Sequence, residues 1–327
     1  MSCTVIYGGF NPSWAAGQLE RGIVDTVAKN LETNNPNKNI TVVVTSWHEP
    51  TDIVVQLQQN NSDINVLCSL TDPLGPIEDK LQEIPGQVWL LGYVSQGIQL
   101  DFWAIACLNF FKQYSNEILP TKFTNLYLNY NRKPHAHRRL LIDALEKNNL
   151  IQYGCNTLGN SNYNIGDQHS DYTAYGADDV VGDVGIPNDV YSLGQLDVWQ
   201  RSFINIVSET QYEYSTNVFL SEKIFKPIIG LRPFIINGSP GIYRWLKQAG
   251  FDCFEDIFPV QELNNETFEY SNRFRNHQLI VNTLNQFKDQ NWMRIYTQLL
   301  PRLQRNKDFF FEYAKRQQDT ITTLFRI

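Results

Sequence analysis

Residues 219–254 read FLSEKIFKPIIGLRPFIINGSPGIYRWLKQAGFDCF, a stretch in which short apolar runs alternate with glycine, proline and charged residues. Ser221 suits the N-cap of a helix that ends near Gly230. Residues 233–236 form a short apolar run of the kind found in a buried strand. Residues 237–241 then form a turn in which glycine lets backbone N–H groups approach a ligand.

The second half of this stretch predicts another helix. Residues 242–249 precede Gly250, which is well placed for a left-handed C-cap, and residues 251–254 are expected to start the next strand. The order helix, strand, loop, helix is typical of a parallel α/β layer, in which ligands lie beyond the carboxyl ends of the strands. That edge corresponds here to residues 237–241, beside a helix N-terminus that favours phosphate.

A family resemblance appears within these residues. The pattern Phe219-x-x-Glu222-Lys223, followed by Pro-Phe-Ile-Ile-x-Gly, resembles the nucleotide-sugar signature of the α-1,3-fucosyltransferase superfamily. The longer pattern, from Ser221-Glu-Lys-x-x-Lys-Pro-Ile to Gly250-Phe-x-x-Phe, is similar to glycosyltransferases encoded by tailed phages, and the match covers residues 127–254. The resemblance implies a GT-B fold, with two Rossmann-like domains and a cleft between them. The alternative is an ordinary amphipathic helix with a Glu–Lys ion pair.

Composition sets the broad class. A chain of 327 residues with 42% hydrophobic residues predicts two domains with apolar cores. The net charge of −7 argues against a strongly basic nucleic-acid-binding surface over the whole protein. There is no apolar run long enough for a membrane span and no secretory signal pattern. The five cysteines are widely spaced, so we expect a reduced, cytoplasmic protein, in the host cytoplasm if it is phage-encoded.

The first part of the chain alternates strands with helices, which predicts a parallel sheet. The predicted strands are residues 4–7, 39–45, 64–70 and 88–94, and a helix is expected over residues 102–114. Asp72 and Asp101 each follow a strand and are candidates for the general base of sugar transfer, with Glu49 as a third. Each aspartate could instead be a helix cap or a turn residue.

The second segment opens with a strand over residues 123–131 and a basic cluster before the helix at residues 140–148. The resemblance implies an arginine here that contacts the nucleotide diphosphate, and both Arg138 and Arg139 match that position. A planar guanidinium suits phosphate because it donates two parallel hydrogen bonds. The alternative is a solvated helix N-terminus. His137 is a further candidate for a phosphate or sugar contact, since the pair with His135 lacks other metal ligands.

The signature assigns the remaining donor contacts. Phe219 replaces the tyrosine common in fucosyltransferases, which weakens a GDP-fucose assignment. The resemblance places Glu222 at the ribose, and Lys223 can meet the phosphates together with the loop from Ser239 to Gly241. Glu209 ends a predicted strand and is either a ribose or sugar contact or a solvated strand end. We predict no cofactor and no metal, since these groups can stabilise the leaving diphosphate alone.

The predicted domains are residues 1–120 as an acceptor-side Rossmann-like domain and residues 121–285 as a nucleotide-sugar-binding one. Residues 286–327 are predicted to be helices that pack back on the first domain. Three hypotheses for the function stay open. The sugar acceptor is a 5-hydroxymethylated pyrimidine in phage DNA, or it is a glycan or lipopolysaccharide, or the protein binds a nucleotide sugar or glycan without turnover.

Overall fold

The computed structural model describes most of the second half of the chain and shorter parts of the first. The described residues are 3–8, 29, 33, 40–45, 64–68, 90–92, 98–99, 101–114, 118–131, 134–158, 180–181, 186–187, 193, 196–210, 212, 218, 220–264 and 270–324. The chain divides into two compact units, residues 1–108 with 312–327, and residues 109–311. The C-terminal segment predicted as one piece over residues 286–327 is therefore divided between the two units.

The first unit contains a five-stranded parallel sheet whose strands follow chain order. The strands are β1 (Cys3–Gly8), β2 (Ile40–Thr45), β3 (Ile64–Cys68), β4 (Leu90–Gly92) and β5 (Ile98–Gln99). Valine, isoleucine and threonine dominate β2, because β-branched side chains pack well on a pleated surface. The four strands predicted from sequence are confirmed at their centres, and β5 was not predicted.

The helix predicted over residues 102–114 is confirmed, with a tighter final turn. It consists of α4 (Phe102–Phe111) and the 3-10 helix η1 (Lys112–Tyr114). Asp101 caps its N-terminus, since its Oδ1 accepts a hydrogen bond of 2.9 Å from the Ala104 amide.

The second unit is built on a four-stranded parallel sheet in the order β11-β10-β6-β7. Its strands are β6 (Asn125–Asn131), β7 (Gly154–Leu158), β10 (Ser202–Ser208) and β11 (Phe234–Asn237). Every residue of β7, β10 and β11 is buried, as expected for parallel strands covered on both faces. The described part of the chain is thus an α/β protein, compatible with a Rossmann-like fold.

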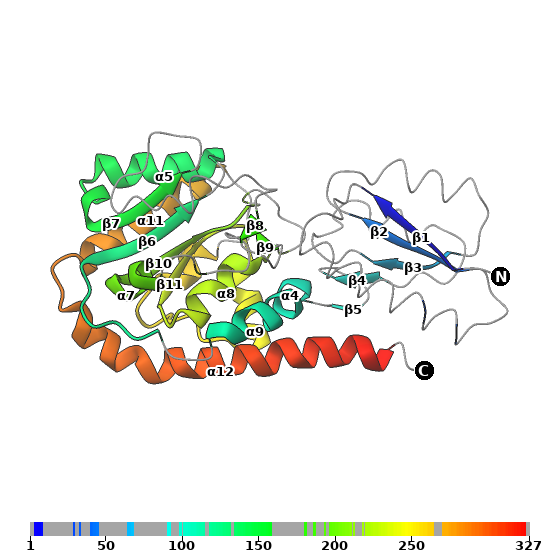
Figure 1. The fold of residues 1–327 in the computed structure, drawn as a ribbon. Helices are drawn as coiled ribbons and strands as arrows, with labels where there is room; N and C mark the ends of the chain where they lie inside the picture. Colours follow the sequence, from blue (N-terminus) through cyan, green and yellow to red (C-terminus); the bar gives the residue numbers. More distant parts are fainter. Residues whose placement is uncertain are drawn as a thin grey trace. The chain divides into compact units, whose positions relative to one another are not determined.

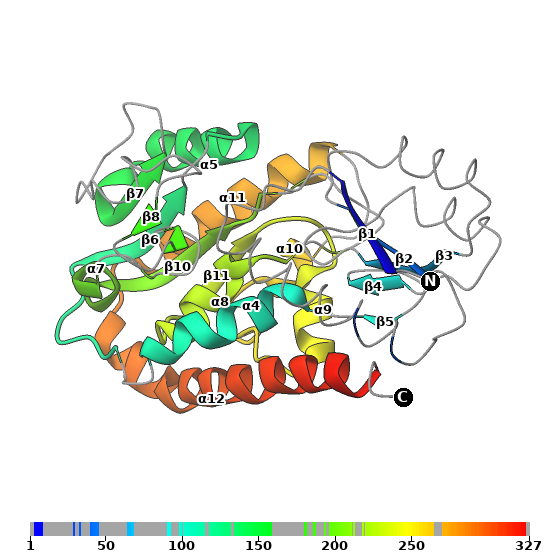
Figure 2. The same cartoon turned by 45° about the vertical axis from the view of Figure 1, so that its right-hand side comes forward.

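Helices cover both faces of this sheet. Figures 1 and 2 show α5 (Ala136–Lys147) and α11 (Tyr270–Phe287) on one side and α8 (Glu222–Ile229) on the other. The long α12 (Trp292–Leu324) packs on α8, where the Phe225 and Phe310 rings lie 5.0 Å apart. The remaining short elements are η2 (Ile151–Tyr153), β8 (Val180–Val181), β9 (Ile186–Pro187), α7 (Leu196–Arg201), α9 (Ile242–Ala249) and α10 (Val260–Leu263).

The unit predicted from residues 219–254 forms largely as expected, with one correction. The Ser221 hydroxyl accepts from the Lys223 amide and caps α8, and Gly250 ends α9 in the left-handed region at φ 111°. The strand expected at residues 251–254 is wrong. The backbone amide of Asp252 donates to the Asn306 side chain, and that of Phe254 to the Asp252 carboxylate. These N–H groups are therefore not available for a strand ladder.

Candidate functional site

Three polar side chains stand side by side at the carboxyl edge of the second sheet. Ser208 on β10 pairs in register with Asn237 on β11. On its other side, β10 pairs with β6 at Asn205 and Leu128, and the same offset brings Ser208 level with Asn131. The chain leaves β6 toward β7 on one side and returns to β10 on the other. The β6–β10 boundary is therefore a topological switch point, where open α/β sheets bind ligands.

The N-terminus of α5 lies against the end of β10. The Nε2 atom of His137 is 2.9 Å from the Glu209 carbonyl oxygen, and Arg138 Nη2 donates to the Ser208 carbonyl at 2.9 Å. Both side chains are buried. Burial, reinforced by the charge of Arg138, lowers the pKa of His137 from 6.5 to about 3. The imidazole is therefore neutral at pH 7, with its proton on the nitrogen that faces the carbonyl oxygen.

Arg138 and Arg139, the two candidates that the sequence offered for a phosphate contact, differ in their surroundings. The Arg138 guanidinium reaches the switch point from a buried position. Arg139 is exposed, and its Nε donates to the Pro134 carbonyl at 2.9 Å within the same helix start. Arg138 is thus the better candidate for a contact with a ligand at this edge.

Glu209 ties the start of α8 to the end of β10. Its buried carboxylate accepts from the Ser221 amide at 3.2 Å and from the Ser221 hydroxyl at 2.6 Å. Burial raises the pKa of Glu209, and the neighbouring Glu222 adds to this, while Lys223 opposes both. Both carboxylate oxygens already hold the cap of α8, so this side chain positions the helix, and its predicted contact with a ribose or sugar stays a prediction.

Glu222 and Lys223 form an ion pair at the first turn of α8. Lys223 Nζ lies 2.9 Å from Glu222 Oε1 and 3.1 Å from the Ser221 hydroxyl. Burial alone would raise the pKa of Glu222, but the charges of Lys223 and Lys226 outweigh it and hold that pKa below its ordinary value. The Lys223 side chain is 28% exposed and that of Glu222 is 6% exposed. Of this pair, the ammonium is the more accessible to a ligand.

The turn after β11 completes the edge. Asn237 Oδ1 and Ser239 Oγ are buried and have no hydrogen-bond partner among the described residues. A Cβ at Gly238 would lie 2.6 Å from Cδ1 of Ile242 and 3.3 Å from Cβ of Glu209, so a side chain here would require Ile242 to shift. Gly241 has φ 84° at the N-cap of α9, and there glycine permits the left-handed backbone. Ser239 and Gly241 are thus brought to the same edge as Glu209.

Sequence reasoning missed an aromatic column beside the site. The rings of His135, His137, Tyr212 and His277 are nearly parallel. His137 and Tyr212 stack at 4.7 Å, and the Tyr212 and His277 rings are 5.7 Å apart. His135 and His137 are two residues apart, but Tyr212 and His277 are distant from them in sequence, so no local pattern could have indicated the whole column. Lys226, buried one turn beyond Glu222, belongs to the longer sequence pattern but was not predicted as a site residue.

The other predicted site residues are not brought to this edge by any described contact. Asp101 belongs to the first unit, and its Oδ2 accepts from the Tyr313 hydroxyl at 3.3 Å. The aspartate therefore caps a helix, which was one of its two interpretations, and its role as a base stays a prediction. Asp72, Glu49 and Phe219 lie outside the described residues.

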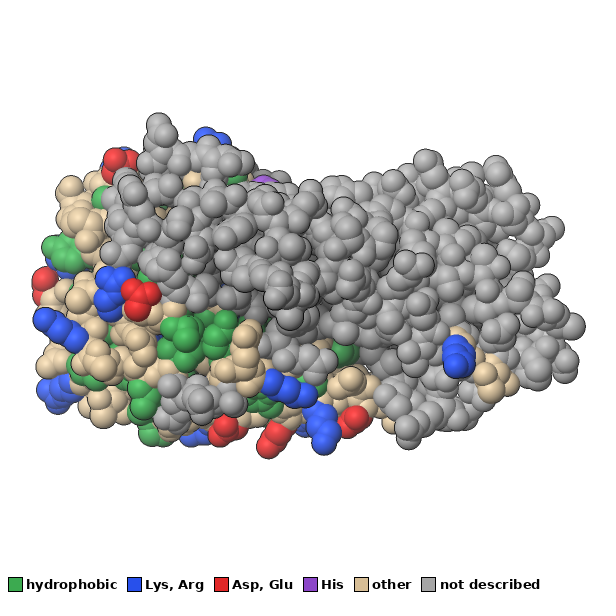
Figure 3. Space-filling view, in the orientation of Figure 1, with side chains coloured by type: hydrophobic (Ala, Val, Ile, Leu, Met, Phe, Trp, Pro, Cys, Tyr) green, Lys and Arg blue, Asp and Glu red, His purple; other side chains and the backbone are tan. Residues whose placement is uncertain are grey.

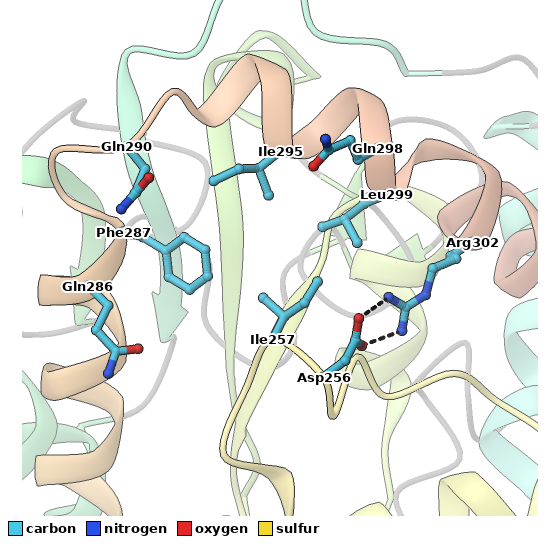
Figure 4. Close-up of a pocket in the computed structure, with 9 residues that line it drawn as sticks. All are labelled: Asp256, Ile257, Gln286, Phe287, Gln290, Ile295, Gln298, Leu299 and Arg302. Atoms are coloured by element: carbon cyan, nitrogen blue, oxygen red, sulfur yellow. Dashed lines mark hydrogen bonds and ion pairs between the residues drawn. The ribbon is translucent and has the colours of Figure 1, made fainter.

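A pocket of about 530 Å³ lies elsewhere in the second unit, between α11, α12 and residues 256–257. In Figure 4, Phe287, Ile257 and Leu299 point into it. Arg302 at its rim binds Asp256 at 2.8 Å and Asp252 at 2.6 Å, so its charge is already matched. None of the predicted site residues lines this pocket. We place the functional site at the sheet edge, where the polar side chains converge.

No family model, curated protein or solved structure matches the chain. Within the described ranges, no cluster of His, Cys, Asp or Glu is arranged to hold a metal ion. No helix in the same part of the chain is long and apolar enough to cross a membrane.

Proposed function

We propose that this chain is a nucleotide-sugar-dependent glycosyltransferase with a GT-B architecture. The observation that carries the proposal is the double role of Glu209 at the switch point. Its carbonyl oxygen meets His137 at the start of α5, and its carboxylate holds Ser221 at the start of α8. Two helix N-termini therefore converge on one strand end. The Glu209 carboxylate already occupies the N-cap of α8, whereas the N-terminus of α5 favours an anion such as a nucleotide diphosphate.

The charges at this edge suit the leaving group of sugar transfer. When the bond between the anomeric carbon and the diphosphate oxygen breaks, negative charge builds up on the diphosphate. Arg138 and Lys223 offer cations, and the backbone at Ser239 and Gly241 offers N–H donors. The acceptor hydroxyl oxygen bonds to the anomeric carbon and gives its proton to a base, for which Asp101 and Asp72 stay the candidates.

A modified pyrimidine in DNA remains our first proposal for the acceptor, because the signature resembles that of phage-encoded glycosyltransferases, and a glycan is the second. Two observations favour the glycan. The net charge is −7, and Figure 3 shows the described Lys, Arg, Asp and Glu side chains interspersed on the face it presents. Retention on a column of hydroxymethylated DNA that falls steeply with salt would favour DNA, because phosphate contacts release counterions. Retention that is low at every salt concentration would favour the glycan.

Turnover of a nucleotide sugar tests the proposal. We would incubate the full chain with UDP-, GDP-, CMP- and dTDP-linked sugars, with hydroxymethylated DNA or glycan acceptors, and follow nucleotide release by chromatography. We expect one donor to release its nucleotide faster than without protein. Donor binding without any release would favour the third hypothesis, a non-catalytic binding protein. Neither binding nor release with any donor would contradict the proposal.

A further inference from the structure

Four buried side chains form a continuous chain of hydrogen bonds that ends at the switch point. One face of β6 carries Tyr127, Asn129 and Asn131, which are two residues apart. On the neighbouring strand β7, Asn156 pairs in register with Asn129. All four are at most 1% exposed. Tyr127 Oη lies 3.3 Å from the Leu150 carbonyl and 3.0 Å from Asn156 Nδ2. Asn129 Nδ2 is 3.2 Å from Asn156 Oδ1, and Asn131 Nδ2 is 3.0 Å from Asn129 Oδ1.

The direction of every bond in this chain is fixed from its inner end. The Leu150 carbonyl oxygen can only accept a hydrogen bond, so the Tyr127 hydroxyl donates its one proton to that oxygen. Asn156 must then turn its NH₂ group toward the tyrosine and its oxygen toward Asn129. The same logic orients Asn129, and after it Asn131, whose NH₂ group faces inward. The amide oxygen of Asn131 is therefore always the atom directed away from the chain.

Glycine at position 154 makes room for the Tyr127 ring, which starts the chain of hydrogen bonds at the Leu150 carbonyl. Gly154 lies opposite Tyr127 in the β6–β7 register, and a Cβ there would lie 2.2 Å from Tyr127 Cζ. The tyrosine ring thus crosses directly over the neighbouring strand to reach the Leu150 carbonyl and Asn156. Any larger residue at position 154 would displace the ring and release the direction of the chain.

The outer end of the chain is incomplete. Asn131 Oδ1 is buried and has no hydrogen-bond partner within the described part of the protein. A buried amide oxygen without a donor is unfavourable and calls for a partner that arrives from outside. Asn237 offers a contrast on β11, because its Nδ2 donates to the Ser208 hydroxyl, which can itself donate or accept. The orientation of Asn237 is adjustable, whereas that of Asn131 is not.

We propose that Asn131 Oδ1 is a fixed hydrogen-bond acceptor that selects the ligand by a donor group on its nucleoside part. The assignment of the ligand as a nucleotide rests on the proposed function. Phosphate oxygens only accept hydrogen bonds, so a phosphate cannot bond to Asn131 Oδ1, which is itself an acceptor. The phosphates of the ligand bind Arg138 and Lys223 instead. The donor is either a base N–H or a ribose hydroxyl, and both share this chemistry.

Nucleotides in which one hydrogen-bond donor is methylated or removed, called masked derivatives here, test whether Asn131 selects the ligand. They also separate a base N–H from a ribose hydroxyl as the donor. The probes are UDP and GDP, their N3-methyl and N1-methyl derivatives, and their 2′-deoxy and 3′-deoxy derivatives, titrated by calorimetry. For the parent that binds, we expect one masked derivative to bind the wild type at least about tenfold more weakly. In Asn131→Ala we expect the affinity for the parent nucleotide to fall by a similar factor, and the affinity for that masked derivative to stay as it is in the wild type. Equal weakening of the parent and every derivative by Asn131→Ala would overturn the proposal.

A distant variant guards against a merely structural effect. Tyr127→Phe leaves the site residues in place but frees the direction of the chain, so the preference for the parent over the masked derivative should shrink severalfold. Tyr296→Phe removes another buried hydroxyl, one that accepts from Arg232 before the start of β11, and should leave the preference unchanged. An unchanged preference in Tyr127→Phe, or an equal loss in both variants, would count against a fixed acceptor.

A neutron crystal structure of the ligand-free protein makes the test independent of the proposed function. It should place two deuterons on the Asn131 amide atom that faces Asn129, in the wild type. Deuterons on the outward atom would overturn the inference whatever the protein binds. The expected orientation, together with no nucleotide binding to the wild type, would refute the proposed function and the nucleoside assignment but leave the fixed acceptor standing.

Discussion

The Glu209 carboxylate accepts a hydrogen bond of 2.6 Å from the hydroxyl of Ser221. This contact joins the end of β10 to the residue that caps α8, twelve positions further along the chain. The carbonyl of the same glutamate meets His137 at the start of α5. The placement of both helix N-termini at the candidate site therefore depends on one buried residue.

Ser221→Ala should destabilise the protein by about 1–3 kcal/mol. The substitution removes the N-cap of α8 and one of the two hydrogen bonds that Ser221 donates to the buried Glu209 carboxylate. Urea unfolding followed by circular dichroism measures the change. Ser221→Thr keeps the hydroxyl and should cost much less. Equal loss in the two variants would show that the hydroxyl is not what stabilises this junction.

His137 should make the protein less stable as the pH falls from about 6.5 toward 3. Burial lowers its pKa from 6.5 to about 3, so between these values the unfolded chain binds a proton that the folded protein does not. Stability then decreases on acidification, by up to about 1.4 kcal/mol per pH unit from this group. In His137→Gln, urea unfolding at several pH values should give a shallower dependence. An identical slope in both proteins would contradict a buried neutral imidazole.

Arg232→Lys should destabilise the second unit by about 3 kcal/mol or more. The Arg232 guanidinium is buried and donates to the carbonyls of Trp199, Ser202, Ile118, Gly230 and Leu231. Burial lowers its pKa to about 10, so it remains charged at pH 7. One ammonium cannot reach so many carbonyls, and several would lose their donor.

Thermal and urea unfolding measure this loss, with Arg294→Lys on an exposed part of α12 as the control. A similar small change in both variants would mean that the fork geometry of Arg232 contributes little. Because Arg232 precedes β11, at the opposite end of that strand from Asn237, nucleotide affinity of the folded Arg232→Lys protein should stay near that of the wild type.

Gly154→Ala should cost about 1–3 kcal/mol, because the new methyl group would meet the Tyr127 ring. Calorimetric unfolding of the variant gives the value. The paired change Gly154→Ala with Tyr127→Leu should recover part of the loss, since the smaller side chain no longer crosses β7. Losses that simply add in the double variant would contradict the direct steric contact.

The sequence predicted local elements better than it predicted the site. Residues 221–250 carry their own caps and turn, so α8, β11 and α9 could be placed from Ser221, Gly230 and Gly250. The strand expected at 251–254 failed because the side chains of Asn306 and Asp252 take its amides, and Asn306 is distant in sequence.

The site itself depends on contacts between strands. Asn131, Ser208 and Asn237 form one row only because three strands share a register, and that register cannot be read from any single segment. The spacing of Asn129 and Asn131 by two residues on β6 was visible in the sequence. The direction of these two amides could not be predicted from that spacing, because Asn156 and the Leu150 carbonyl, which lie outside β6, fix it.

The most direct test of the central claim is nucleotide-sugar affinity of the wild type against Lys223→Ala, measured by calorimetry with the UDP-, GDP-, CMP- and dTDP-linked panel. Lys247→Ala, which removes an exposed lysine of α9 that pairs with Glu255, is the control of equal charge change. We predict that one donor binds the wild type and Lys247→Ala alike, and binds Lys223→Ala at least about tenfold more weakly. Equal affinity of all three proteins, or no binding by any, would contradict a donor site at the carboxyl edge of this sheet.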